Sequence, residues 1–130
     1  MNTSALPTEL SLSRQNAITL AIESWRLNRI AAVLGNTQES TSLRYATRQF
    51  SDILSEMNIE IVDMVGRVYD PGMAPEVVDV RDDPKLAEGV AIIDETVSPT
   101  VLWRGQVIEP GQVSLRRGHS IVQSAMEAHL

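Results

Sequence analysis

The chain has 130 residues, of which 43% are hydrophobic, 22% charged and 4% aromatic, and its formal net charge is −6. This balance indicates one soluble globular domain whose core is built mainly from aliphatic side chains, and it excludes an intrinsically disordered chain. The negative charge argues against a nucleic-acid partner, because phosphates are bound by Lys and Arg, and the absence of cysteine excludes disulfides and thiolate chemistry.

The first ten residues, MNTSALPTEL, predict a flexible lead-in. They contain no basic stretch followed by an apolar one, so we expect no signal peptide. No apolar run approaches the ~20 residues that a membrane-spanning helix requires. We therefore expect a cytoplasmic protein that does not contact a membrane.

Residues 11–34 lack Gly and Pro and predict a helix that ends at Gly35 and Asn36. Projection at 100° per residue gives this helix two apolar faces, so two neighbours are needed to cover it. The first face comprises Ile18, Ala21, Ile22, Trp25, Ala32 and Val33, and the second comprises Leu20, Leu27, Ala31 and Leu34.

Residues 42–57 predict a second helix with a single apolar stripe. The two helices together have three apolar faces, two on the first and one on the second. Packing them against each other buries two of these faces and leaves one for another subunit or the rest of the chain. We therefore predict that residues 11–57 form a helical hairpin that dimerises as a bundle. The predicted dimer interface comprises Leu20, Trp25, Leu27, Ala31 and Leu34.

Residues 58–118 change to short β-rich runs separated by Gly, Pro and Asp turns. The expected strands are 59–62, 77–80, 89–93, 101–103 and 112–115. The sequence thus predicts an α+β fold in which an N-terminal helical hairpin precedes a small, mostly antiparallel β-domain. Residues 119–130 are expected to be a C-terminal tail, as a short amphipathic helix or a frayed end.

Carboxylates are the strongest candidates for catalysis, because two or three in one pocket could serve a hydrolase or hold Mg²⁺. However, Asp70 and Asp83 stand in Asp-Pro-Gly and Asp-Asp-Pro turns, where an Asp side chain caps backbone amides. No nucleophile, phosphate-loop or zinc motif is present. We expect no catalytic residue, no metal and no cofactor, so the protein is not an enzyme on this interpretation. The candidate set is Asp63, Asp70, Glu76, Asp79, Asp82 and Asp83.

The stretch Trp103-Arg104-Gly105-Gln106 predicts the tip of a β-hairpin. It carries an aromatic side chain and a cation, both of which are frequent at interface hot spots. The alternative is that Trp103 belongs to the core of a domain that has few aromatic residues.

With this order of elements, the chain resembles the GrpE family of nucleotide exchange factors for DnaK-type chaperones. The family pattern runs from a helix end through an apolar step and a Gly-x-x-Phe-Asp-Pro corner to a small β-domain with a Pro-marked final strand. The similar segments here are residues 50–57, 58–62, 66–71 (Gly-Arg-Val-Tyr-Asp-Pro), 100–103 and 107–113.

The sequence also departs from the family pattern. Met73-Ala74-Pro75-Glu76 stands where the family has a histidine, Thr100-Val101 replaces Gly-Tyr, and Glu109 replaces a basic residue. The family's long N-terminal coiled-coil helix has no counterpart of that length. These differences point to a changed partner.

The resemblance implies a homodimer whose β-domain binds the ATPase domain of a DnaK-type chaperone and promotes ADP release. The implied partner-binding residues are Trp103, Arg104, Gln106, Glu109, Tyr69 and Met73. The implied structural corner comprises Gly66, Asp70, Pro71 and Pro110, with residues 66–71 expected where the helical part passes into the β-domain. A non-exchanging adaptor for a specialised chaperone-like partner and a small carboxylate-dependent hydrolase remain as alternatives.

Overall fold

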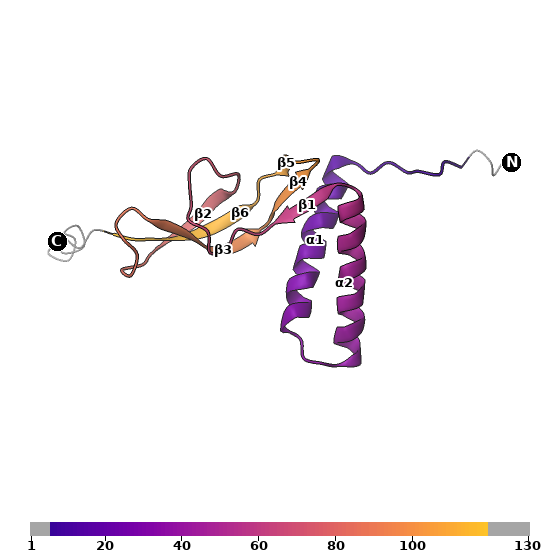
Figure 1. Ribbon diagram of the computed structural model, residues 1–130, viewed down its shortest axis with the longest axis horizontal. Helices are drawn as coiled ribbons and strands as arrows, with labels where there is room; N and C mark the ends of the chain where they lie inside the picture. The colour runs from indigo at the N-terminus through magenta and orange to yellow at the C-terminus, as the bar shows by residue number, and fades with distance from the viewer. Residues whose placement is uncertain (1–5, 120–130) are drawn as a thin grey trace.

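Two helices and two small sheets build the predicted α+β fold, which a computed structural model describes over residues 6–119 (Figure 1). Most of the predicted C-terminal tail lies outside the described residues. Within residues 6–119, no helix has the length and apolar character needed to cross a bilayer. The elements are α1 (Arg14–Val33), α2 (Gln38–Glu56), β1 (Ile59–Val62), β2 (Glu76–Asp82), β3 (Ala91–Ser98), β4 (Thr100–Trp103), β5 (Gln106–Glu109) and β6 (Gln112–Arg117).

Side-chain caps fix where the two helices begin. The Ser13 hydroxyl accepts a hydrogen bond from the amide of Asn16, so α1 begins at Arg14. Thr37 and Ser40 form a capping box, in which each hydroxyl accepts the other residue's amide hydrogen, at 3.1 and 2.9 Å. This cap starts α2 four residues before the predicted position, because the first turn of the helix is polar and adds nothing to the apolar stripe.

The strands form two three-stranded sheets, with orders β1-β4-β5 (sheet A) and β2-β6-β3 (sheet B). Sheet A is antiparallel throughout, and β3 is antiparallel to β6. The exception to the antiparallel arrangement is β2, which pairs with β6 in parallel. The long connection from β2 to β6 makes this possible, since parallel neighbours require a crossover.

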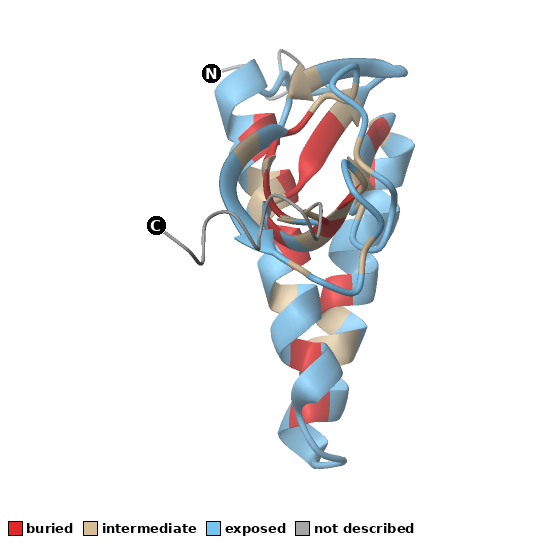
Figure 2. Cartoon of the chain, turned by 90° about the vertical axis from the view of Figure 1, so that its left-hand side faces the viewer, coloured by how far each residue is buried: buried red, intermediate tan, exposed pale blue. Residues whose placement is uncertain are grey.

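The buried apolar residues fall into two clusters. The first joins both helices to sheet A through Ala17, Ala21, Leu54, Ile59 and Val101. Figure 2 shows buried positions along the shared side of the helices and exposed positions on their outer sides. The second cluster belongs to sheet B and comprises Ala91, Ile93, Val113 and Leu115.

The segment 66–71 does not lie where the helices pass into the sheets, so this part of the prediction is wrong. The passage occurs at Asn58, whose φ of 61° ends α2 and directs the chain into β1. Residues 66–71 instead run along β3, where the amides of Gly66 and Tyr69 donate to the carbonyls of Ile93 and Ala91. The segment therefore connects the two sheets.

The other connections between the sheets pack closely against each other. Pro99 separates β3 from β4, and Pro110 and Gly111 separate β5 from β6. The Thr100 hydroxyl donates to the Pro110 carbonyl at 2.7 Å. Gly111 has φ 80°, and a Cβ placed on it would lie 2.7 Å from the carbonyl carbon of Pro99. The result is an elongated β part, with the helical hairpin leaving it near one end at a steep angle (Figure 1).

Candidate partner-binding site

The β4–β5 hairpin has the tip that the sequence predicted. Arg104 and Gly105 form its turn with φ values of 51° and 78°, the positive pair that is typical of a type I′ turn. Trp103 and Gln106 are opposite each other beside the turn. The amide of Arg104 donates to the Asn58 carbonyl at 2.9 Å, so the tip is fixed to the start of β1.

Trp103 is not a core residue, because 41% of its surface is exposed. The guanidinium carbon of Arg104 lies 4.5 Å from the centroid of the Trp103 ring, within the range of a cation–π contact. An aromatic ring and a cation are thus presented together on a short, well-defined turn.

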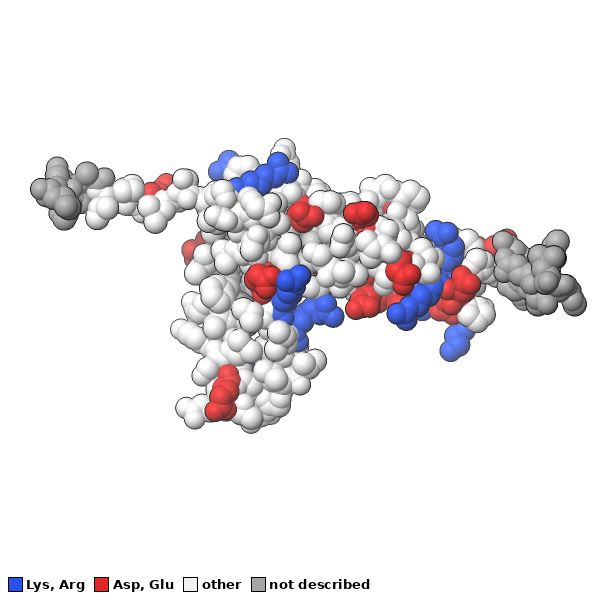
Figure 3. All heavy atoms as spheres, turned by 180° about the vertical axis from the view of Figure 1, so that it is seen from behind, with Lys and Arg blue, Asp and Glu red and all other residues white. Residues whose placement is uncertain are grey.

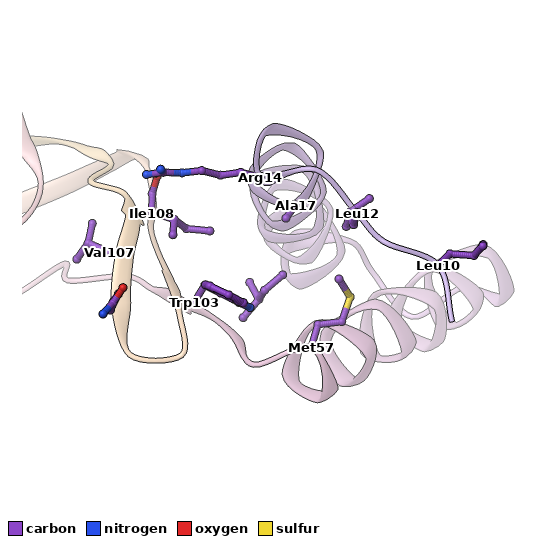
Figure 4. Close-up of a pocket in the computed structure, with 10 residues that line it drawn as sticks. Leu10, Leu12, Arg14, Ala17, Met57, Trp103, Val107 and Ile108 are labelled. Atoms are coloured by element: carbon purple, nitrogen blue, oxygen red, sulfur yellow. The ribbon is translucent and has the colours of Figure 1, made fainter. Parts of the chain in front are cut away.

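Beside this tip lies an apolar groove with a volume of about 490 Å³. It is bounded by the β4–β5 hairpin, the beginning of α1, the end of α2 and the lead-in that precedes α1 (Figure 4). Because most of the lining is aliphatic, the groove suits an apolar side chain or a short apolar segment. The lining residues are Leu10, Leu12, Arg14, Ala17, Met57, Ile59, Trp103, Gln106, Val107 and Ile108.

One arginine, Arg14, lines the groove, and a second, Arg104, stacks on the lining residue Trp103. Arg14 donates from Nη2 to the Ile108 carbonyl at 3.3 Å, on the outer edge of sheet A. The Arg104 backbone forms the hairpin turn, and its guanidinium lies over the Trp103 ring. In the described part of the chain, neither arginine takes part in an ion pair. In a chain of net charge −6, these two guanidinium groups are complementary to carboxylates.

The remaining predicted partner-binding residues lie in different surroundings. Glu109 is half-buried at the end of β5, opposite Val101. Tyr69 and Met73 are half-buried and pack against the apolar cluster of sheet B. The structure therefore gathers Trp103, Arg104 and Gln106 at one place, while Tyr69 and Met73 belong to the other sheet.

The predicted dimer-interface residues also differ in how far their own chain covers them. Trp25 and Ala31 are 9% and 1% exposed, so little of either remains for a second copy. Leu20 and Leu27 are half-buried, and Leu34 is exposed. On α2, Phe50 and Ile53 are exposed, and helical spacing places them on one side with Ala46 and Met57.

Carboxylates of the candidate catalytic set serve separate turns and contacts. The Asp70 carboxylate accepts the Gly72 amide at 3.0 Å, which confirms that Asp70 caps its turn. Asp83 likewise accepts the Lys85 amide at 2.9 Å. This backbone bond, together with the Arg116 guanidinium, lowers the pKa of Asp83. Over residues 6–119, no group of three or more His, Cys, Asp or Glu side chains has an arrangement that could hold a metal ion.

Charges of both signs are interspersed over the β part, whereas much of the helical hairpin is uncharged on the face shown in Figure 3. Asp83 and Asp94 both pair with Arg116, at 3.2 and 3.3 Å, and Asp82 pairs with His119. Such local pairing leaves no single-sign field over sheet B. On this face, the helical hairpin carries fewer charges than the β part.

Sequence reasoning missed several residues that line the groove, including Arg14, Leu12 and Met57. Leu12 and Arg14 fell in the predicted helix 11–34 and Met57 in the predicted helix 42–57, and only Leu10 lay in the predicted lead-in. Their common location depends on the approach of β5 to the start of α1, which no short-range pattern encodes. No protein-family model matches the chain, and no curated protein shows significant sequence similarity to it.

Proposed function

We propose that the chain is a GrpE-like cochaperone that binds the ATPase domain of a DnaK-type chaperone in the cytoplasm and promotes release of ADP. The observation that carries this proposal is the exposed Trp103–Arg104 pair on a fixed turn beside an apolar groove. The resemblance described above supplies the class of partner.

The hairpin tip has the features of a binding hot spot. Trp and Arg are enriched among residues that contribute most to binding, particularly where neighbouring apolar contacts exclude water. Here the groove provides those neighbours. The type I′ turn and its bond to Asn58 fix the backbone of the tip, so little conformational entropy is lost when a partner binds.

Exchange of this kind needs no catalytic side chain. A protein that binds the open form of an ATPase cleft better than the closed, nucleotide-bound form shifts the equilibrium towards the open form. By linkage, it weakens ADP binding by the same factor, and couplings of about 1–3 kcal/mol correspond to roughly 5–150-fold.

We also propose that the helical hairpins of two copies associate into a bundle. The apolar side chains that support this dimer are the exposed Leu34, Phe50 and Ile53 and the half-buried Leu20 and Leu27. Leu20 and Leu27 are seven residues apart on α1, the spacing of apolar residues along a coiled-coil interface, and Leu34 caps the end of the helix. A two-fold dimer would cover these side chains with the same side chains of the other copy.

The test is release of fluorescently labelled ADP from a DnaK-type chaperone of the same organism, measured by stopped-flow with and without the full chain. We expect faster release, and a loss of that effect in Trp103→Ala. Tyr45→Ala is the matched control, because it removes an exposed aromatic from the outer side of α2.

If calorimetry shows that the chaperone binds the chain but ADP release is not faster, the result would support the adaptor function and contradict the exchange function. Absence of binding, under conditions in which a known exchange factor binds, would contradict both.

A further inference from the structure

We infer that Asp63, Trp25, Arg29 and Thr96 form a brace that sets the orientation of sheet B relative to the helical hairpin. The brace links the middle of α1 to the residue that follows β1 and to β3. It lies apart from the residues that line the groove. The inference does not depend on the identity of the partner.

The molecule has two separate apolar clusters, so packing of a common core does not fix sheet B to the helices. The helices and sheet A share one apolar cluster, whereas sheet B has its own. The Arg14 bond to Ile108 fixes α1 to sheet A and not to sheet B. Sheet B is therefore held to the helices through chain connections at the sheet boundary and through contacts made by the middle of α1.

On the β side, Asp63 is firmly fixed. It directly follows β1 of sheet A, and its Oδ1 accepts the Thr96 hydroxyl of β3 at 2.7 Å. The same oxygen accepts the Val65 amide at 3.1 Å. The Thr96 bond thus joins the end of a sheet A strand to a strand of sheet B, and the Val65 bond fixes the carboxylate to its own turn, both at ordinary length.

On the helix side, the contacts are longer. The Trp25 indole donates to Asp63 Oδ2 at 3.4 Å, and Arg29 donates to the Thr96 carbonyl at 3.4 Å. Arg29 also stacks over the Trp25 ring, 4.6 Å from its centroid. Because positions 25 and 29 are one turn apart, the two side chains act as a unit.

The difference in bond lengths indicates where the brace opens. Donor–acceptor distances of 3.4 Å lie beyond the usual range of about 2.7–3.2 Å for an N–H···O hydrogen bond, so these two contacts are weaker than those at 2.7–3.1 Å. We therefore expect the contact to break between α1 and Asp63, with the bond between Asp63 and Thr96 intact. Opening would free sheet B to change its angle while the helices and sheet A stay together.

The test is residual dipolar couplings of backbone amides in the full chain, with α1, α2, β1 and β4 as one set and β3 and β6 as the other. In the natural sequence, one alignment tensor should fit both sets. In Trp25→Phe/Arg29→Gln, which keeps the aromatic packing but removes both donors, the second set should require a tensor of different orientation or smaller magnitude. Arg26→Gln is the matched control, since the ion pair of Arg26 within residues 6–119 is with Glu23, on the outer side of α1.

Thr96→Val provides a second route, because it removes the hydroxyl that anchors Asp63 in sheet B with little change in volume. In Thr96→Val, too, the couplings of β3 and β6 should require a different tensor from those of the helices and sheet A. If the double variant fails to fold, Thr96→Val tests the inference by itself. A single tensor for both sets in the folded brace variants would overturn the inference. A separation of equal size in Arg26→Gln would also overturn it.

Discussion

The Arg104 guanidinium lies over the ring of the residue that precedes it, Trp103, with 4.5 Å between the guanidinium carbon and the ring centroid. Arg104 achieves this from a left-handed backbone conformation, with φ 51°, which a non-glycine residue adopts at some cost. A substitution that keeps the left-handed backbone but removes the guanidinium can therefore test the role of the side chain in binding without disturbing the turn.

Arg104→Asn should weaken partner binding without loss of stability. Asn tolerates positive φ, and Asn-Gly is a preferred type I′ pair, so the hairpin should be as stable as before or slightly more stable. Loss of the cation and its stacking should raise the Kd for the chaperone by about fivefold, equivalent to about 1 kcal/mol. Calorimetric titration gives the Kd, and thermal unfolding checks the stability. An unchanged Kd would show that the Arg104 side chain does not contribute to binding.

Gly111→Ala should be strongly destabilising. The new methyl would lie 2.7 Å from the Pro99 carbonyl carbon and the Ser98 carbonyl oxygen, at a position with φ 80°. We expect the free energy of unfolding in urea to fall by about 2–4 kcal/mol, from backbone strain plus displacement of the Pro99 connection. Gly105→Ala is the control, because φ is 78° there but no atom lies within 4 Å of the new methyl. Equal losses in the two variants would show that close packing at Pro99 is not the cause.

Phe50→Glu should convert the proposed dimer into a monomer. Phe50 is 39% exposed in the single chain, so its replacement leaves the core intact, but it puts a charge on the surface that the two copies would share. Sedimentation velocity at micromolar concentration should show a dimer for the natural sequence and a monomer for the variant. Tyr45→Glu, on the outer side of α2, should leave the dimer intact. A natural chain that sediments as a monomer would exclude the bundle.

Asp83 should contribute to stability in a pH-dependent way. Its pKa in the folded chain is lowered from the ordinary value of an Asp carboxyl, chiefly because the carboxylate accepts the Lys85 amide, with Arg116 as a further cause. A carboxyl with a lowered folded pKa stabilises the fold fully above its unfolded pKa, and this contribution is lost as the pH falls through the folded pKa. Urea unfolding between pH 6 and pH 2.5 should therefore show a smaller loss of stability on acidification for Asp83→Asn than for the natural chain. The same pH dependence in both would contradict this role.

The helices, the β-rich second half and the Asp turns could be predicted because each depends on residues close in sequence. Apolar spacing indicated both helices, and Asp70 caps the turn in which it stands. The Trp103–Gln106 tip was predictable for the same reason, since a type I′ turn is decided by its central residues.

Contacts between distant segments could not be predicted. Trp25 was assigned to a dimer interface, yet its indole contacts Asp63 across 38 positions of sequence. The groove depends on the approach of Arg14 to Ile108 across 94 positions. The start of α2 was displaced because a capping box of polar residues precedes the apolar stripe.

The strand order of sheet B has a consequence for synthesis on the ribosome. Its central strand, β6, is the last strand of the described chain, and it inserts between β2 and β3, which are made earlier. All elements of the helices and of sheet A have been synthesised once β5 is complete. Sheet B cannot form at that point, because β2 and β3 do not pair with each other and their common neighbour β6 is complete only at residue 117. A chain cut anywhere before β6 would therefore keep two exposed strand edges, which favour aggregation.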